Sequence, residues 1–251
     1  MIITITKQDI IDSLLDLGLK SGDEIEVHSS LSSFGYVDGG AETVISALKD
    51  VVGKDGSIFM PALRLSKELP LTETDRKLGI TTKIQILPEN CEHSAMGIIA
   101  DTFRKMPDTV TNDGIFRISA WGKSANEVKD GLQYLIHNGG KALMLGVDIY
   151  KLTAMHYVED LLPEDIKNYF PLSDEINNIY PPDKYLIEAG AFPVKPWYTI
   201  QNTAYEKGII KNGLIGNSKV MFFDIWDVVG LYEQEIKNNP YRLYGVRKDI
   251  K

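Results

Sequence analysis

The side chains best suited to proton transfer lie in residues 141–160, KALMLGVDIYKLTAMHYVED. His156 and Glu159 are three positions apart, so on a helix they would lie on one face. A carboxylate beside an imidazole suits general acid–base catalysis, because the ordinary pKa of histidine lies close to neutral pH. The same spacing is found where a partly buried histidine has a surface glutamate as neighbour, and this stretch alone favours that ordinary interpretation.

The elements around this pair are a strand, a turn and a helix. The apolar run at 142–145 predicts a buried strand that stops at the turn glycine Gly146. Asp148 follows the turn, and the helix that comes next carries Thr153, His156 and Glu159. A strand that ends in a glycine turn and then presents a histidine beside a carboxylate is a reasonable place for proton-transfer chemistry.

A second stretch with chemical potential is HSSLSSFGYVDGG at residues 28–40, which lies between an expected strand and an expected helix. Its serine hydroxyls and backbone N–H groups could hold the phosphate or amide groups of a ligand. It is neither a Walker A loop nor a dinucleotide fingerprint, because the glycine spacing of both is absent. A polar surface loop with a capping role is an equally good interpretation from spacing alone.

Composition narrows the classes of function. The chain has 251 residues, 43% of them hydrophobic and 25% charged, with a net charge of −8 and no basic block. Nucleic acid is therefore not an expected partner, since phosphate binding needs clustered positive charge. The single Cys91 excludes an internal disulfide and argues against a thiolate metal site. With no signal-peptide pattern and no run long enough to span a bilayer, we expect a cytoplasmic protein without a membrane partner.

Periodicity predicts alternating helices and strands. The first half has helices at 6–17 and 41–52, with strands at 24–28 and 57–61. Residues 21–62 thus form a βαβ unit, which implies a parallel strand pair. Further helices are expected at 94–105, 126–137 and 227–237, and a strand at 220–223. With no linker or repeat, residues 1–251 are expected to form one domain.

Two long stretches have weaker patterns. Residues 63–92 are charged and are interpreted as an excursion over the sheet edge that could serve as a substrate lid. Residues 160–198 are rich in aromatic residues and proline, and they either line an acceptor pocket or form a β-rich covering layer with proline at its edges. The second interpretation is favoured.

Taken together, these segments resemble the aminoglycoside 3-N-acetyltransferase family. The first two matches are the serine loop with the residues around it (17–44, then Gly56 and Met60-Pro61) and Met96-Gly97 through Phe103-Arg104. The third is Gly146 with residues 153–159, TAMHYVE, which is similar to the family signature T-S-x-H-x-x-E. The fourth is the glycine-rich stretch Gly208, Gly213 and Gly216-Asn217 before the last strand. The resemblance covers residues 6 to about 235.

The resemblance implies an α/β fold, a three-layer α/β/α sandwich with a mixed, largely parallel central sheet. It implies acetyl-CoA as co-substrate, without a metal, and a small-molecule amine as acceptor. The general base falls on His156, with Glu159 as its orienting carboxylate. The CoA-binding role falls on Ser29, Ser30, Leu31, Ser32, Gly35, Arg104 and Ser119. We further expect Asp113, Asp148 and Thr153 to bind the acceptor. A homodimer is an open expectation.

This sequence departs from the family pattern at one motif. The family has R-S-x-H-P-x-x-S-x-A-A-x-G, whereas residues 110–122 read VTNDGIFRISAWG. Asp113 and Gly114 replace the His-Pro pair, Arg117 replaces the middle serine, and Ala62 stands where a threonine usually follows Met-Pro. Two alternatives therefore stay open. The acceptor could be a nucleotide-linked or glycan amino sugar, or the chain could bind CoA without catalysis. A metal site at His156 and Glu159 is disfavoured, because a second histidine is not close in the sequence.

Overall fold

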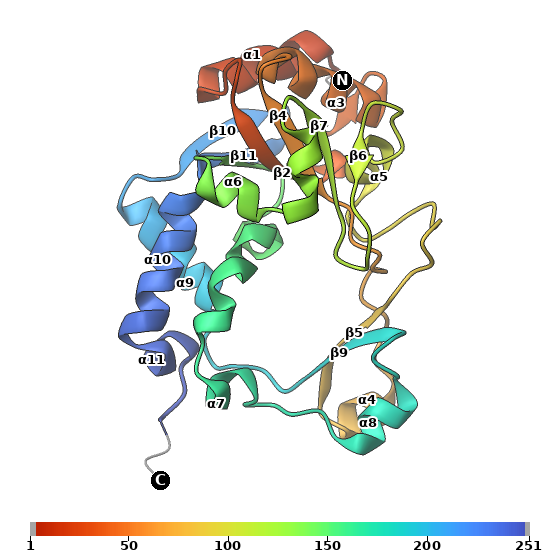
Figure 1. Ribbon diagram of the computed structural model, residues 1–251, viewed down its shortest axis with the longest axis vertical. Coiled ribbons are helices and arrows are strands. Elements are labelled where there is room, and N and C mark those ends of the chain that lie inside the picture. The colour runs from red at the N-terminus through yellow and green to blue at the C-terminus, as the bar shows by residue number, and fades with distance from the viewer. Residues whose placement is uncertain (1–3, 249–251) are drawn as a thin grey trace.

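The computed structural model describes residues 4–248, and a seven-stranded sheet lies at its centre (Figure 1). The strand order is β10-β11-β8-β2-β4-β7-β6. In chain order the strands are β2 (Glu24–Ser29), β4 (Ser57–Pro61), β6 (Val110–Thr111), β7 (Ile118–Gly122), β8 (Lys141–Leu145), β10 (Lys211–Ile215) and β11 (Ser218–Asp224). The strands β8, β2 and β4 run parallel, and every other neighbouring pair in this sheet is antiparallel. The predicted mixed sheet is confirmed, but parallel pairing is limited to the three central strands.

Helices cover both faces of this sheet, which confirms the three-layer prediction. One face carries α1 (Lys7–Leu17), α3 (Gly40–Val52) and α5 (Ile98–Phe103). The other carries α6 (Gln133–His137), the 3-10 helix η3 (Thr153–Leu161), α9 (Pro196–Glu206), α10 (Ile225–Asn238) and α11 (Pro240–Tyr244). Alternation along the strands creates the two cores, since Ile25 and Val27 belong to the first face and Phe59 and Met144 to the second.

Local sequence signals explain where several elements begin and end. Thr6 caps α1 through a reciprocal capping box with Asp9, and Gly18 ends that helix in the left-handed region at φ 100°. Every residue of β4 is buried, as its apolar run predicts for a central strand covered on both faces. The remaining short elements are β1 (Thr4–Ile5), β3 (Tyr36–Val37), α2 (Leu31–Phe34), η1 (Ala125–Asp130), η2 (Ile149–Lys151) and α7 (Glu164–Lys167).

The charged excursion after β4 is more ordered than its sequence indicates. It contains α4 (Glu73–Lys77) and β5 (Ile80–Gln85), and β5 pairs antiparallel with β9 (Tyr185–Ala189). With α8 (Asp174–Ile179), these elements form an arm at the lower right of Figure 1, which we call the β5–β9 arm. The strand was not predicted, because the partner that completes its hydrogen bonds lies about 100 residues away in the sequence.

Two other expectations are corrected. The helix predicted over 126–137 is divided at Gly131, whose φ of 60° stops η1 before α6 begins. Residues 160–198 are not a β-rich layer, because they contain α7, α8 and the first turn of α9 with β9 as their single strand. Pro196 stands in the first turn of α9, where proline needs no N–H partner.

Candidate active site

The carboxyl ends of the parallel strands meet at one edge of the sheet and bring the two chemically interesting stretches together. Strand β2 ends at Ser29 and its neighbour β8 ends at Leu145. The Ser30 N–H donates to the Leu145 carbonyl over 2.9 Å, which joins the start of the serine loop to the end of β8. Parallel pairing therefore places residues that are more than 100 positions apart in one site.

The turn at Gly146 fits directly against the serine loop. Gly146 has a φ of +71°, and a Cβ on this residue would overlap the Ser33 side chain. The Ser33 hydroxyl donates to the Ser30 carbonyl over 2.6 Å and lies 2.8 Å from the Ser218 hydroxyl. Glycine is therefore needed at 146 both for its backbone conformation and for the close approach of the serine loop.

Helix η3 aligns Thr153, His156 and Glu159. It is a 3-10 helix, and side chains three positions apart in such a helix stand directly above one another. His156 Nδ1 lies 2.6 Å from Glu159 Oε2. Because a carboxylate can only accept, Nδ1 carries the proton, and in the neutral ring Nε2 keeps its lone pair. The His156 side chain is 64% exposed, so the imidazole can be reached from solvent.

A chain of hydrogen bonds extends from this pair into the core. The Tyr232 hydroxyl donates to Glu159 Oε1 over 3.3 Å and lies 2.5 Å from the Tyr244 hydroxyl. Burial raises the pKa of Tyr232, so its hydroxyl stays protonated and can donate. The Trp197 ring packs edge-on against the imidazole, with 4.8 Å between centroids. Glu159 and Trp197 together fix the orientation of His156.

The electrostatic surroundings favour the charged form of His156. Partial desolvation opposes it, but the hydrogen bond and negative charge of Glu159 outweigh this and raise the pKa of His156 above its ordinary value. Two more distant carboxylates, Glu26 on β2 and Glu188 on β9, raise this pKa further. Negative charge from three separate elements therefore acts on His156.

Aromatic rings and a carboxylate lie beside Trp197. Tyr150 and Tyr198 have their ring centroids 4.3 Å apart, and Tyr150 lies 5.3 Å from Trp197. Asp148 accepts hydrogen bonds from the Tyr198 hydroxyl at 2.9 Å and from the Tyr150 N–H at 3.0 Å. The Lys195 ammonium lies over both rings, 5.6 Å from the Tyr150 centroid and 5.9 Å from the Tyr198 centroid, so Asp148 rather than the ring faces would attract a positively charged ligand.

The serine loop keeps several polar groups available. Ser29 and Ser30 are half-buried and Ser32 is exposed, with the Ser30 and Ser32 hydroxyls 3.2 Å apart. Leu31 begins α2, and Gly35 ends it with a φ of 94°. All the loop residues expected to bind CoA therefore lie together just beyond the carboxyl end of β2. Thr153 also faces β2, because its N–H lies 3.3 Å from His28 Nε2.

Three other expected site residues have different surroundings. Arg104 is held by Asp101 at 3.0 Å and by the Cys91 carbonyl at 2.5 Å, so its guanidinium fastens the 91–92 loop. Ser119 is fully buried in β7 and lies 2.8 Å from the Thr111 hydroxyl. Asp113 is exposed on the loop between β6 and β7. The structure does not bring Arg104 or Ser119 into an open site beside His156.

Two buried polar features were not identified as site residues from the sequence. Glu26 and His28 lie in contact on β2 beneath η3, and the signal for them is the E-x-H alternation within a buried strand. Arg117 is also buried, and its Nε donates to the Ala62 carbonyl over 2.9 Å. Burial and the positive charges of Arg104 and Arg64 lower the pKa of Arg117.

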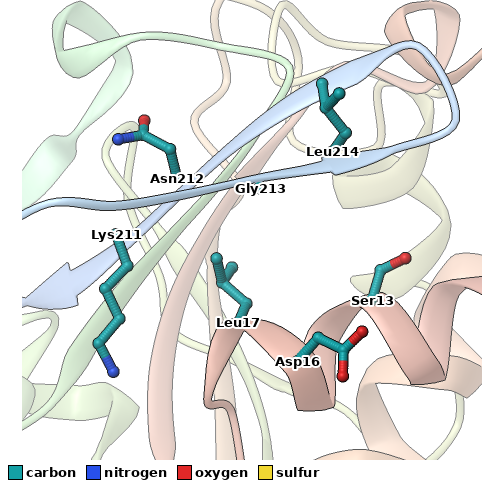
Figure 2. Close-up of a pocket in the computed structure, with 7 residues that line it drawn as sticks. All are labelled: Ser13, Asp16, Leu17, Lys211, Asn212, Gly213 and Leu214. Carbon is teal, nitrogen blue, oxygen red and sulfur yellow. The ribbon is translucent and has the colours of Figure 1, made fainter.

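Other surface features lie apart from this site. Figure 2 shows an open recess between α1 and β10, lined by Ser13, Asp16, Leu17, Lys211, Asn212, Gly213 and Leu214. It belongs to the α1 face of the sheet, whereas η3 covers the opposite face. Within residues 4–248, no three His, Cys, Asp or Glu side chains form a group that could hold a metal ion. No helix in this described part is long and apolar enough to cross a bilayer.

Comparison with known sequences gives a consistent result. A sequence model of the family described as aminoglycoside 3-N-acetyltransferase matches residues 27–237. The SPbeta prophage-derived aminoglycoside N(3')-acetyltransferase-like protein YokD of Bacillus subtilis (strain 168) is 29% identical over 257 residues, which cover 93% of each chain. Aminoglycoside N(3)-acetyltransferase III of Salmonella sp is 27% identical over 268 residues, which cover 89% of this chain and 88% of the relative.

Solved structures share the same fold. The crystal structure of YokD has a TM-score of 0.69 at 25% identity, and the match covers 96% of both chains. The apoenzyme of aminoglycoside acetyltransferase AAC(3)-IVa has a TM-score of 0.69 at 20% identity, covering 97% of this chain and 92% of the other. The binary complex of AAC-IIIb with CoASH has a TM-score of 0.68 at 19% identity, covering 98% of this chain and all of the other.

Proposed function

Because the chain belongs to the aminoglycoside 3-N-acetyltransferase family, we propose that it moves an acetyl group from acetyl-CoA to an amine of an aminoglycoside or a related amino sugar. One domain would carry both substrates, with His156 as the general base. The observation that carries this proposal is the hydrogen-bond chain Tyr244–Tyr232–Glu159–His156, which leaves only Nε2 of the imidazole free to accept a proton.

The proposed chemistry needs one base. The acceptor amine adds to the thioester carbonyl, a C–N bond forms, the C–S bond breaks, and CoA leaves as the thiolate. The amine must lose a proton in this process, and His156 Nε2 takes it and can return it to the leaving sulfur. General-base catalysis of this kind contributes about 10²- to 10⁴-fold in rate. Glu159 stabilises the imidazolium that forms.

The donor side rests on the serine loop. Ser29, Ser30 and Ser32 offer hydroxyl groups, and Leu31 an apolar side chain, next to the carboxyl end of β2. The serine hydroxyls fit the amide-rich arm and the phosphates of acetyl-CoA, because both of these parts accept hydrogen bonds. Arg104 and Ser119 contribute indirectly in this proposal, by holding the neighbouring loop and strand.

The acceptor side rests on negative charge near aromatic rings. Asp148 and Glu188 would attract the ammonium groups of an amino sugar, while Tyr150 and Tyr198 would contact the ring faces. A solved structure of a histidine-to-alanine mutant of AAC(3)-IVa, 19% identical to this chain, is a complex with a gentamicin. An acceptor of that chemical kind fits the charges named here.

The test is release of free CoA thiol from acetyl-CoA with a panel of amines. Aminoglycosides, nucleotide-linked amino sugars and glycan amino sugars form three arms of the panel. Turnover with aminoglycosides supports the proposal. Turnover with only one of the other arms would support acetyl transfer but assign the acceptor to that other class of amino sugar. Binding of CoA without thiol release in any arm would overturn acetyl transfer and leave a CoA-binding protein.

A further inference from the structure

A pair of ionisable side chains lies inside the central strand of the sheet, directly beneath η3. Glu26 and His28 alternate along β2 and point to the same face, where Phe59 and Ala142 flank Glu26 on the adjacent strands. Glu26 is fully buried and His28 is 8% exposed. Glu26 Oε1 and His28 Nε2 lie 2.6 Å apart, and that distance requires a proton between them.

The contacts of this pair lead to the start of η3. The Ala154 N–H donates to Glu26 Oε1 over 3.3 Å, and the Thr153 N–H points at His28 Nε2 over the same distance. The first turn of the helix that carries His156 is thus seated on the pair. The early N–H groups of a helix lack partners within it, so the contact with Glu26 satisfies a donor that would otherwise be unpaired.

Stabilisation of the folded state does not explain why Glu26 and His28 are buried together. Glu26 Oε2 is buried and has no hydrogen-bond partner among residues 4–248. A buried carboxylate with an unpaired oxygen costs free energy, and apolar side chains would fill the same space more favourably. An unsatisfied buried group of this kind calls for a role other than packing.

His156 lies one 3-10 turn beyond Thr153, within range of the charge on Glu26. The titratable and aromatic groups that face His156 come from several elements. They are Glu159 on η3, Glu26 and His28 on β2, Glu188 on β9, Trp197 on α9, and Tyr232 and Tyr244 behind Glu159 on α10 and α11. Glu26 differs from Glu159 and Glu188 because it is fully enclosed, so water and salt screen its charge least.

We propose that Glu26, together with His28, is a positioning residue for acetyl transfer: the pair seats the first turn of η3, and the negative charge of the Glu26 carboxylate stabilises the imidazolium of His156. This inference rests on the proposed role of His156 as base. Glu26 does not touch the substrate. It acts through the Ala154 N–H and through its field at His156, while His28 contacts the Thr153 N–H.

The test compares Glu26→Gln with Glu24→Gln. Glu24 lies two positions earlier on the same strand, its carboxylate is held by Ser57, Ser124 and Tyr134, and it is not among the charges that act on His156. The His156 ring is followed by NMR during a pH titration and assigned from the signal that His156→Ala removes. Glu26→Gln is expected to move the titration of His156 to lower pH, and Glu24→Gln to leave it unchanged.

Steady-state kinetics provide a second measurement of the effect of Glu26→Gln. In Glu26→Gln, kcat with a saturating acceptor is expected to fall about three- to tenfold, with KM for the acceptor within twofold and the acid limb of kcat/KM moved to lower pH. An unchanged His156 titration in a folded Glu26→Gln protein would overturn the proposal. So would an equal shift in Glu24→Gln.

A second variant, His28→Gln, tests the proposal if Glu26→Gln does not fold. His28→Gln keeps a donor for Glu26 Oε1 and leaves the carboxylate in place, so the His156 titration should stay near that of the unmodified protein. A shift to higher pH in His28→Gln would show that His28 carries a positive charge and would also overturn the proposal. The NMR reading needs no turnover, so it remains decisive even if the protein fails to transfer acetyl groups and the proposed function falls.

Discussion

His156 Nδ1 lies 2.6 Å from Glu159 Oε2, and this contact decides which ring nitrogen can act as a base. The carboxylate holds the proton on Nδ1, which leaves Nε2 of the neutral ring as the nitrogen that can accept a proton. Tyr232 holds the other oxygen of Glu159 and keeps the carboxylate from rotating away. The sequence shows only that His156 and Glu159 are close along the chain. The hydrogen bond from Tyr232, 73 positions after Glu159, is what fixes the carboxylate that orients the imidazole.

Replacing His156 by alanine should abolish nearly all acetyl transfer. The expected loss in kcat is about 10²-fold or more, because the proposed base is removed, while CoA binding measured by calorimetry is retained. His93→Ala is the matched control, since His93 is an exposed histidine that has no part in the proposed chemistry. Near-normal turnover in His156→Ala would contradict the mechanism.

Replacing Glu159 by glutamine should lower both the rate of acetyl transfer and the pH at which His156 ionises. The Glu159 carboxylate is the strongest influence that raises the pKa of His156, so its loss moves the acid limb of kcat/KM to lower pH. Because glutamine can still accept from Nδ1, kcat should fall less than in His156→Ala, by about tenfold. A pH–rate profile of both proteins measures this, and an acid limb that moves to higher pH is the contrary result.

Replacing Gly146 by alanine should disturb the donor side. The added Cβ overlaps the Ser33 side chain, so the serine loop must shift and CoA should bind about tenfold more weakly or worse. Gly208→Ala is the control, because Gly208 has a similar φ of +69° but no atom within 4 Å of the new Cβ. Both variants carry the left-handed backbone cost, so their difference in CoA affinity isolates the contact with the serine loop. Equal affinities of the two variants for CoA would show that the contact between Gly146 and the serine loop does not affect CoA binding.

Replacing Glu188 by glutamine should weaken acceptor binding without affecting the donor. Glu188 is held by the Thr82 hydroxyl at 2.8 Å, and its charge reaches His156 from the β5–β9 arm. KM for a polycationic acceptor should rise about threefold to tenfold, with less effect at high salt because the side chain is exposed. Steady-state kinetics at two salt concentrations measure this. A higher KM for acetyl-CoA instead would place Glu188 on the donor side.

The β5–β9 arm should lose stability in acid. Burial disfavours the Asp75 carboxylate, but hydrogen bonds from Lys83 and Tyr180 outweigh it and hold the pKa well below its usual range. Asp75 therefore stabilises the arm fully above the ordinary carboxyl pKa of about 4, and this contribution is lost as pH falls below that value. Limited proteolysis of residues 63–92 against pH measures the opening. In the Asp75→Asn variant, the β5–β9 arm should open about tenfold more often than in the unmodified protein, even at pH 7.

The sequence by itself determined the elements whose signals are local. Thr6 and Gly18 bound α1, the apolar runs gave β4 and β8, and the serine loop and the H-x-x-E pair were visible as candidates. These features depend on residues within a few positions of one another, where capping, periodicity and turn chemistry act.

The tertiary structure alone decided features that depend on distant partners. The pairing of β5 with β9, the antiparallel outer strands of the sheet and the division of the 126–137 helix could not be obtained from local pattern. The same holds for the buried contact of Glu26 with His28 beneath η3, and for Tyr232 and Trp197 against Glu159 and His156. Alternation predicts which strand residues share a face, but only packing shows which face is covered and by what. The physical reason is that burial, and with it the strength of each charge, is a property of the whole fold.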